Sequence, residues 1–102
     1  YAEAYYNRGT AHRILKDNRQ AASDFSMAIS LNPQYAEAYN NRGNAYRDLG
    51  NYQQAIEDYS IAIRLNSQDA IAYRNRGITY GNLGNHEQAI KDFKKADELS
   101  LR

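Results

Sequence analysis

Apolar and small residues recur every three or four positions in two stretches near the middle of the chain. This spacing is typical of one face of an α-helix, so it predicts one helix over residues 36–49 and another over residues 52–65. The Gly50-Asn51 pair interrupts the pattern between them, as a glycine does just past a helix end. Small residues alternate with tyrosines in both stretches, which favours close packing of the two helices against each other.

The pattern occurs three times with a period of 34 residues, over 1–34, 35–68 and 69–102. A period of about 20 to 50 residues is typical of a solenoid, in which each unit buries its apolar face against its neighbours. We therefore predict an all-α fold, an α-solenoid of three antiparallel helix pairs. The positions shared by all copies are Ala2/Ala36/Ala70, Ala4/Ala38/Ala72, Tyr5/Tyr39/Tyr73, Asn7/Asn41/Asn75, Arg8/Arg42/Arg76, Gly9/Gly43/Gly77, Leu15/Leu49/Leu83, Gln20/Gln54/Gln88, Ala21/Ala55/Ala89, Asp24/Asp58/Asp92, Ala28/Ala62/Ala96 and Leu31/Leu65/Leu99.

The chain starts and stops in phase with its repeat. We expect a single array over residues 1–102, either cut from a longer array or engineered. The copies differ at most positions, which argues against an idealised consensus design.

The charge balance argues against a nucleic-acid partner. The 13 basic and 12 acidic side chains are interspersed and give a formal net charge of +1, whereas binding of phosphates needs a one-sided basic surface. No apolar run approaches the ~20 residues of a membrane span, so we expect no membrane partner either. Cysteine is absent, which removes thiolate metal ligands and thiol nucleophiles. Localisation stays open, with the cytoplasm as the first expectation.

Aromatic and small residues stand at fixed places in each copy. In the middle copy they are Tyr39, Gly43, Tyr46, Ala55, Tyr59 and Ala62, and Ser67 follows in the exit turn. This pattern resembles the tetratricopeptide repeat family over the whole chain, apart from Ser67, where the family usually has proline. The resemblance implies a right-handed superhelix of helix A and helix B pairs, with helices A on the concave face. It also implies a non-enzymatic protein-protein interaction scaffold that binds a peptide segment in that concave groove.

The first copy departs from the pattern at the turn between its helices. Lys16 stands where the other copies carry Gly50 and Gly84. We expect this turn to be the least well packed of the three. Gly81 lies inside the third helix A, where glycine costs about 1 kcal/mol relative to alanine.

One charged pair recurs in every copy, an arginine before the small residue of helix A and an aspartate before the aromatic of helix B. We expect each arginine to pair with an aspartate of the same or the adjoining unit. Independent solvated charges are the alternative. Such pairs would set the spacing between units more than they would add stability, because desolvation cancels much of their Coulomb gain. The residues are Arg8, Arg42, Arg76, Asp24, Asp58 and Asp92.

Polar side chains of helix A outside the buried stripe outline the concave groove. Asparagine repeats there as Asn7, Asn41 and Asn75, and side-chain amides can hold an extended peptide by its main chain. The row resembles the asparagine ladder in the tetratricopeptide superhelix of the glycosyltransferase that attaches N-acetylglucosamine to proteins. The alternative is that these asparagines brace neighbouring helices. The other groove residues, whose mixed charges suit a polar or partly acidic ligand, are Tyr6, Asn40, Arg74, Thr10, Asn44, Ile78, Arg13 and Arg47.

Tetratricopeptide domains of chaperone adaptors hold the C-terminal carboxylate of a partner in a clamp of lysines, arginine and asparagines. Only Asn41 matches that clamp. Tyr6, Thr10, Ile71 and Asn75 stand where lysine, asparagine, lysine and arginine would be needed. We therefore expect no tight binding of acidic chaperone tails.

The sequence does not indicate an enzyme. His12 replaces the aromatic found as Tyr46 and Tyr80, which favours a packing role over a general base. The carboxylates form no converging pair or triad, and there is no glycine-rich phosphate loop. We predict a chain without a catalytic site, a metal or a cofactor.

The two ends of the array suggest a second hypothesis. Such arrays commonly finish with an extra polar-faced helix, and none follows the third helix B here. We expect Ala89, Ile90, Phe93 and Ala96 to be partly exposed. Exposed ends favour a structural spacer or self-assembling unit, whose ends stack on other copies of the chain.

Overall fold

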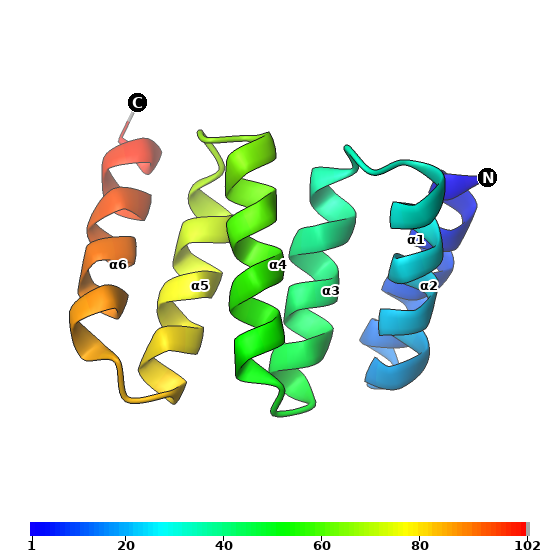
Figure 1. The fold of residues 1–102 in the computed structure, drawn as a ribbon, viewed down its shortest axis with the longest axis horizontal. Coiled ribbons are helices and arrows are strands. Elements are labelled where there is room, and N and C mark those ends of the chain that lie inside the picture. Colours follow the sequence, from blue (N-terminus) through cyan, green and yellow to red (C-terminus); the bar gives the residue numbers. More distant parts are fainter. Residues whose placement is uncertain (102) are drawn as a thin grey trace.

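The computed structural model describes residues 1–101 and shows six helices within them, joined by short turns (Figure 1). The two helices of each repeat run antiparallel, and the three pairs lie side by side in chain order (Figure 1). The predicted all-α class and antiparallel pairing are confirmed. The helices are α1 (Ala2–Ile14), α2 (Asn18–Leu31), α3 (Ala36–Asp48), α4 (Tyr52–Leu65), α5 (Ala70–Asn82) and α6 (His86–Ser100).

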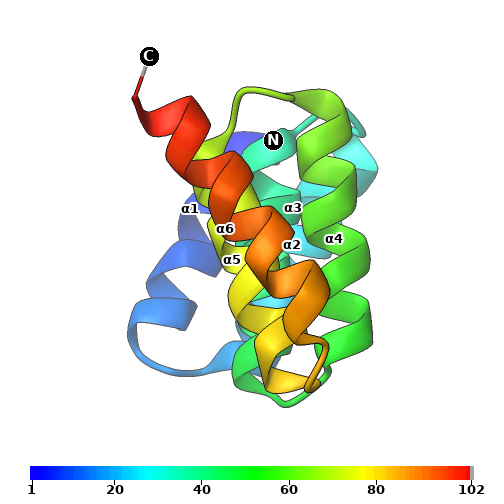
Figure 2. The same ribbon diagram turned by 90° about the vertical axis from the view of Figure 1, so that its left-hand side faces the viewer.

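The contacts between helices show which side of the stack is curved inward. Each helix packs mainly on the helices before and after it in the chain. In addition, α1 contacts α3 and α3 contacts α5, whereas α2, α4 and α6 do not contact one another in the part of the chain that the structure describes. The first helices of the repeats therefore lie closest together. Figure 2, seen from the α6 end, shows successive pairs turned relative to one another. We call the side lined by α1, α3 and α5 the inner face.

Helix boundaries follow local sequence signals. The predicted helix over residues 52–65 coincides with α4, and the one over 36–49 ends one residue earlier, at Asp48. Asp17 and Asn85 accept hydrogen bonds from backbone N–H groups in the first turns of α2 and α6, which satisfies donors that a helix start leaves open.

The turns use the left-handed backbone conformation. Gly50 and Gly84 have φ of 82° and 81°, and Lys16 adopts φ of 65° at the equivalent place. A side chain in this region is unfavourable, because its Cβ crowds the backbone. Ile14 and Leu15 before this turn are largely exposed, more so than Leu49 in the second repeat. The expectation of a poorly packed first turn is confirmed.

A glycine in each first helix admits the aromatic ring of the second. A Cβ on Gly43 would lie 2.7 Å from Cε1 of Tyr59, and one on Gly9 would lie 2.9 Å from Cε1 of Phe25. Both rings are fully buried. The helices of a pair can therefore approach this closely only because glycine has no side chain.

The end of the stack is only partly open. Ile90 and Phe93 of α6 are exposed to solvent as expected, but Ala89 and Ala96 are buried against α5, so the expectation is wrong for these two alanines. Their small side chains lie on the face that α6 turns toward its own partner helix. No helix among residues 1–101 has the length and apolar character needed to cross a membrane.

Candidate functional site

Each repeat contains the same two-pronged ion pair between its helices. In the second repeat, Nε and Nη2 of Arg42 donate to the two carboxylate oxygens of Asp58, both at 2.8 Å. Arg8 and Asp24 form the same contact in the first repeat at 2.9 and 2.8 Å. The third copy, with Arg76 and Asp92, has the same distances as the first. Each arginine thus pairs with the aspartate of its own repeat.

In the second and third repeats, a further N–H group of the arginine donates to the repeat before it. Nη1 of Arg42 donates to Oγ of Ser26, and Nη1 of Arg76 donates to Oγ of Ser60, both at 3.1 Å. The Arg42 guanidinium also lies over the Tyr39 and Tyr46 rings, 5.6 and 5.7 Å from their centroids. These contacts enclose the arginine between two helix pairs. Sequence reasoning missed the serines, although they recur with the same period.

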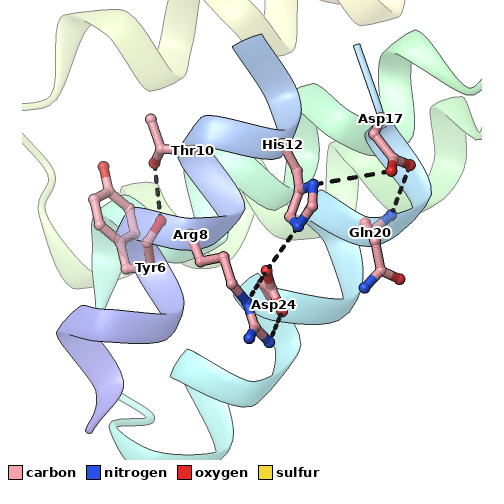
Figure 3. Close-up of polar contacts among 7 residues, drawn as sticks. All are labelled: Tyr6, Arg8, Thr10, His12, Asp17, Gln20 and Asp24. Atoms are coloured by element: carbon pink, nitrogen blue, oxygen red, sulfur yellow. Dashed lines mark hydrogen bonds and ion pairs between the residues drawn. The ribbon is translucent and has the colours of Figure 1, made fainter. Parts of the chain in front are cut away.

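The first repeat lacks this enclosure. The Arg8 side chain is 60% exposed, compared with 19% for Arg42. His12 stands where the second repeat has Tyr46, and its Nε2 lies 3.8 Å from Oδ2 of Asp24 (Figure 3). The imidazole therefore adds a polar neighbour to the ion pair where the other repeats add an aromatic ring.

Burial shifts the pKa values of the pair. The Arg8 hydrogen bonds lower the pKa of the Asp24 carboxyl. In the second repeat, desolvation outweighs the hydrogen bonds from Arg42 and raises the pKa of Asp58, while those bonds raise the pKa of the guanidinium. The ion pair is thus more desolvated between two repeats than in the first repeat, where its arginine is largely exposed.

The asparagine row lies on the inner face and links neighbouring repeats. Nδ2 of Asn41 donates to the Tyr6 hydroxyl at 2.8 Å, and Nδ2 of Asn75 donates to Oδ1 of Asn40 at 3.4 Å. Each bond joins a helix to the equivalent helix of the preceding repeat. Asn7 is exposed. Bracing of neighbouring helices, the alternative considered from the sequence, is therefore present for two of the three asparagines.

The placement of Asn44 outside the buried stripe is wrong. Its side chain is buried, with 7% of the residue exposed, and its Oδ1 accepts a 2.5 Å hydrogen bond from the Tyr59 hydroxyl. Burial raises the pKa of Tyr59 to about 12. The buried Thr79 of the next repeat also interacts with this hydroxyl. The first and third repeats have phenylalanine at the position of Tyr59. Only the second repeat therefore places a hydroxyl from α4 against α3, where Asn44 is its hydrogen-bond acceptor.

Three charged residues cluster on the inner face near the ends of α1 and α3. Nη1 of Arg13 lies 3.7 Å from Oδ2 of Asp48, and Nε of Arg47 lies 4.0 Å from Oδ1 of the same carboxylate. Nη1 of Arg47 is buried and has no hydrogen-bond partner within residues 1–101. Two arginines therefore share one carboxylate, and one buried donor has no acceptor.

The other expected groove residues differ in whether they contact the chain itself or are exposed to solvent. Tyr6 stacks on Tyr35 with ring centroids 4.9 Å apart, and Thr10 donates to the Tyr6 carbonyl at 3.0 Å (Figure 3). Arg74 and Ile78 are exposed on α5. Tyr6 and Thr10 thus make contacts within the chain, whereas Arg74 and Ile78 are exposed to solvent.

Metal-binding chemistry has no candidate group in the described part of the chain. No three histidine, cysteine, aspartate or glutamate side chains among residues 1–101 lie close enough together to hold an ion.

The stacked antiparallel pairs, with a glycine under each buried or half-buried aromatic, define a helical-repeat protein. Tetratricopeptide repeat models match residues 2–35, 25–57 and 70–101, and a model described as TPR repeat matches residues 43–84. The chain belongs to the tetratricopeptide repeat family, as its sequence pattern predicts. Repeats of this family generally mediate protein-protein interaction.

Solved structures of the family superpose closely. The TPR domain of Arabidopsis OM64 gives a TM-score of 0.95 at 30% identity, covering 99% of this chain and 84% of that one. MamA gives 0.94 at 36% identity over 98% of this chain, which spans only 58% of MamA. The first TPR of Spaghetti (RPAP3), bound to the HSP90 peptide SRMEEVD, gives 0.94 at 26% identity, covering 96% of this chain and 78% of that one. No curated protein matches the chain significantly in sequence.

Proposed function

We propose that the chain is a non-enzymatic interaction module that binds an extended, polar or partly acidic protein segment along its inner face. The observation that carries the proposal is the buried Nη1 of Arg47, which has no acceptor in the described chain. A buried charged donor without a partner is costly, because it loses its hydration and gains nothing in return. The Arg47 side chain is 21% exposed, so its guanidinium can turn toward a bound segment, whose carboxylate or main-chain carbonyl would supply the acceptor.

The local charge favours an acidic segment. Arg13 and Arg47 share Asp48, so this cluster has one positive charge in excess. Arg74 adds a further exposed positive charge on α5. A negatively charged side chain beside Arg47 would be attracted by this excess and would form charge-assisted hydrogen bonds with its guanidinium.

The asparagine row can contribute while it braces the stack. An amide has two N–H donors and one carbonyl, and the bonds to Tyr6 and Asn40 use one donor each of Asn41 and Asn75. The remaining donors suit the main-chain carbonyls of an extended segment, and Asn7 continues the row at its exposed end. Such contacts would be independent of the ligand's side chains.

The bound peptide of Spaghetti (RPAP3) is not the ligand we expect here. Tyr6, Thr10 and Asn75, which stand at three clamp positions, are engaged in hydrogen bonds within the chain. Ile71 at a fourth is apolar and exposed. We expect the peptide SRMEEVD to bind with a Kd well above about 1 μM, and tighter binding in a calorimetric titration would contradict this.

A peptide display selection tests the proposal. The parent chain is compared with the Arg47→Gln variant and with Arg64→Gln, a matched control on the exposed surface of α4. Acidic peptides should be enriched on the parent and on the control but not on Arg47→Gln. A second variant with Asn7, Asn41 and Asn75 changed to alanine, used after its circular dichroism is shown to match the parent, tests the amide row. Failure to enrich any peptide, or equal enrichment on Arg47→Gln, would refute the proposal.

A further inference from the structure

Arg13 and Arg47 stand at equivalent positions of α1 and α3, but the next repeat offers them different neighbours. Nη1 of Arg13 lies 3.7 Å from Oδ2 of Asp48, which is the last residue of α3. The equivalent last residue of α5 is Asn82. α3 contacts α5 as α1 contacts α3, and α3 and α5 end at the same edge of the stack (Figure 1). Where α3 offers Arg13 a carboxylate, α5 therefore offers Arg47 only a neutral amide.

This difference accounts for the unpaired donor of Arg47. Its Nη1 has no acceptor within residues 1–101, so the amide oxygen of Asn82 does not accept from it. The carboxylate of Asp48 is already shared with Arg13 and lies 4.0 Å from Nε of Arg47. The Arg47 side chain is 21% exposed and Asn82 is exposed. A carboxylate of another molecule can therefore reach the place that an aspartate of α5 would fill.

The surface of α5 beside Asn82 is apolar and open. Ile78 lies about one turn before it and is 40% exposed. A Cβ on Gly81 would meet nothing within 4 Å, and the backbone of Gly81 has no positive φ, so neither packing nor conformation requires glycine there. Glycine inside a helix costs about 1 kcal/mol relative to alanine. What it offers in return is space for a ligand group to approach the helix backbone.

The spacing of these groups suits alternate side chains of an extended segment. Ile78 and Asn82 are four residues apart, which corresponds to a rise of about 6 Å along a helix. Side chains two positions apart on an extended chain point the same way and are about 6.6 Å from each other. An acidic side chain near Asn82 therefore places the residue two positions away over Ile78.

We propose that the junction of α3 and α5 binds an aspartate or glutamate of the segment in place of the carboxylate that α5 lacks, and that a large aliphatic side chain two positions away packs on Ile78 and over Gly81. This inference rests on the proposed binding at Arg47 and adds where the carboxylate lies and which kind of residue accompanies it. The junction of α1 and α3 takes no such residue, because Asp48 already supplies its carboxylate.

Asn82→Asp tests the junction without any ligand, because it supplies the missing carboxylate from the chain itself. We expect it to raise the urea midpoint of unfolding in the parent by more than in the Arg47→Gln background, where the donor is absent. Asn85→Asp is the matched control, since it makes the same change at the N-cap of α6, where aspartate also caps well. Its effect should be the same in both backgrounds. Equal effects of Asn82→Asp in both backgrounds would overturn the proposal.

Peptide display on the same variants tests the ligand. The parent and Asn85→Asp should enrich peptides with an acidic residue and a large aliphatic residue two positions from it. Peptides from this selection should bind Asn82→Asp at least about tenfold more weakly in calorimetric titration, because an internal carboxylate competes for the charge-assisted hydrogen bonds. Ile78→Gln, at an exposed position, should keep the acidic preference and lose the aliphatic one.

The outcomes separate this inference from the proposed function. Acidic peptides that depend on Arg47 but bind the parent and Asn82→Asp equally would overturn the inference and leave the proposed function standing. Enrichment of acidic peptides without an aliphatic residue two positions away would also overturn it. Failure to enrich any acidic peptide on the parent would refute the proposed function, and the inference with it.

Discussion

The first and second repeats contain the same arginine-aspartate pair in different surroundings. The aspartates are equally buried, with 3% and 4% of their side chains exposed in Asp24 and Asp58. The arginines differ threefold, from 60% in Arg8 to 19% in Arg42. Each helix pair therefore buries its own aspartate, whereas the burial of its arginine depends on the preceding pair. The same arginine-aspartate pair therefore has a different energetic role in the two repeats.

The largest effect is expected on removing the aspartate of each pair, and it should differ between the two repeats. Asp58→Ala leaves the enclosed Arg42 guanidinium without its carboxylate, which should lower the free energy of unfolding by about 3–5 kcal/mol. Asp24→Ala should cost clearly less, because Arg8 can turn to water. Urea denaturation of the two variants measures the difference. Equal losses would mean that the preceding helix pair does not matter.

Close packing under the aromatic ring gives the next effect. Gly43→Ala places a methyl group 2.7 Å from Tyr59 and should cost about 1–3 kcal/mol. The Tyr59 ring is held at its hydroxyl and cannot easily move away, whereas Phe25 has no hydroxyl, so Gly9→Ala should cost less. Gly81→Ala is the control, since its methyl group meets nothing within 4 Å, and it should stabilise by about 1 kcal/mol. Thermal unfolding of the three variants would test this order.

The hydroxyl of Tyr59 distinguishes the second repeat further. Tyr59→Phe should cost about 1 kcal/mol, because it leaves the buried Asn44 without its donor. Adding Asn44→Thr and Thr79→Ala gives this repeat the residues found around Phe25 in the first, and should restore most of the loss. If the triple variant is less stable than Tyr59→Phe in urea, these three residues cannot be replaced as a group by those of the first repeat.

The same hydroxyl predicts sensitivity to alkali. The pKa of Tyr59 is raised to about 12 in the folded chain, and that of an unfolded tyrosine is about 10. The neutral phenol therefore stabilises the fold fully below about pH 10, and this contribution is lost as the pH rises from 10 toward 12. Between these values the stability of Tyr59→Phe should fall less steeply than that of the parent. Parallel slopes in unfolding experiments at several pH values would contradict the assignment.

The smallest effect concerns the turns. Lys16→Gly should stabilise the first repeat by up to about 1 kcal/mol, because φ of 65° strains a residue with a side chain, while the added freedom of the unfolded glycine offsets part of the gain. Gly50→Lys in the second repeat should destabilise by a similar amount. Thermal unfolding can resolve both. A loss on Lys16→Gly would show that the lysine side chain has a stabilising contact that outweighs the strain.

Much of the fold follows from the sequence because its signals are local and repeated. Helical spacing and the Gly50-Asn51 break fix the limits of α4, and the coincidence of arginine and aspartate in every copy indicates a shared contact. A period repeated three times removes the ambiguity that a single short helix would leave.

What the sequence did not predict depends on side chains that cross from one helix to another. The burial of Asn44 results from a hydroxyl that reaches it from α4, and helical spacing around α3 alone cannot show this. The shared use of Asp48 by Arg13 and Arg47 depends on the distance between α1 and α3. The serine acceptors were visible as a repeated Ser26 and Ser60, but the spatial offset between helix pairs was needed to recognise them.

In four side-chain hydrogen bonds between neighbouring repeats, the donor lies in the later repeat and the acceptor in the earlier one. Arg42 and Arg76 reach back to Ser26 and Ser60, and Asn41 and Asn75 reach back to the previous first helix. Deleting the third repeat therefore removes the donors of two of these bonds and leaves only their acceptors in the repeat before it. Shortening the array from the N-terminal side leaves a guanidinium and an amide behind without their acceptors. The array is therefore asymmetric along its length, because the second and third repeats take these acceptors from the repeat before them. During synthesis the repeat that supplies the acceptors is made first.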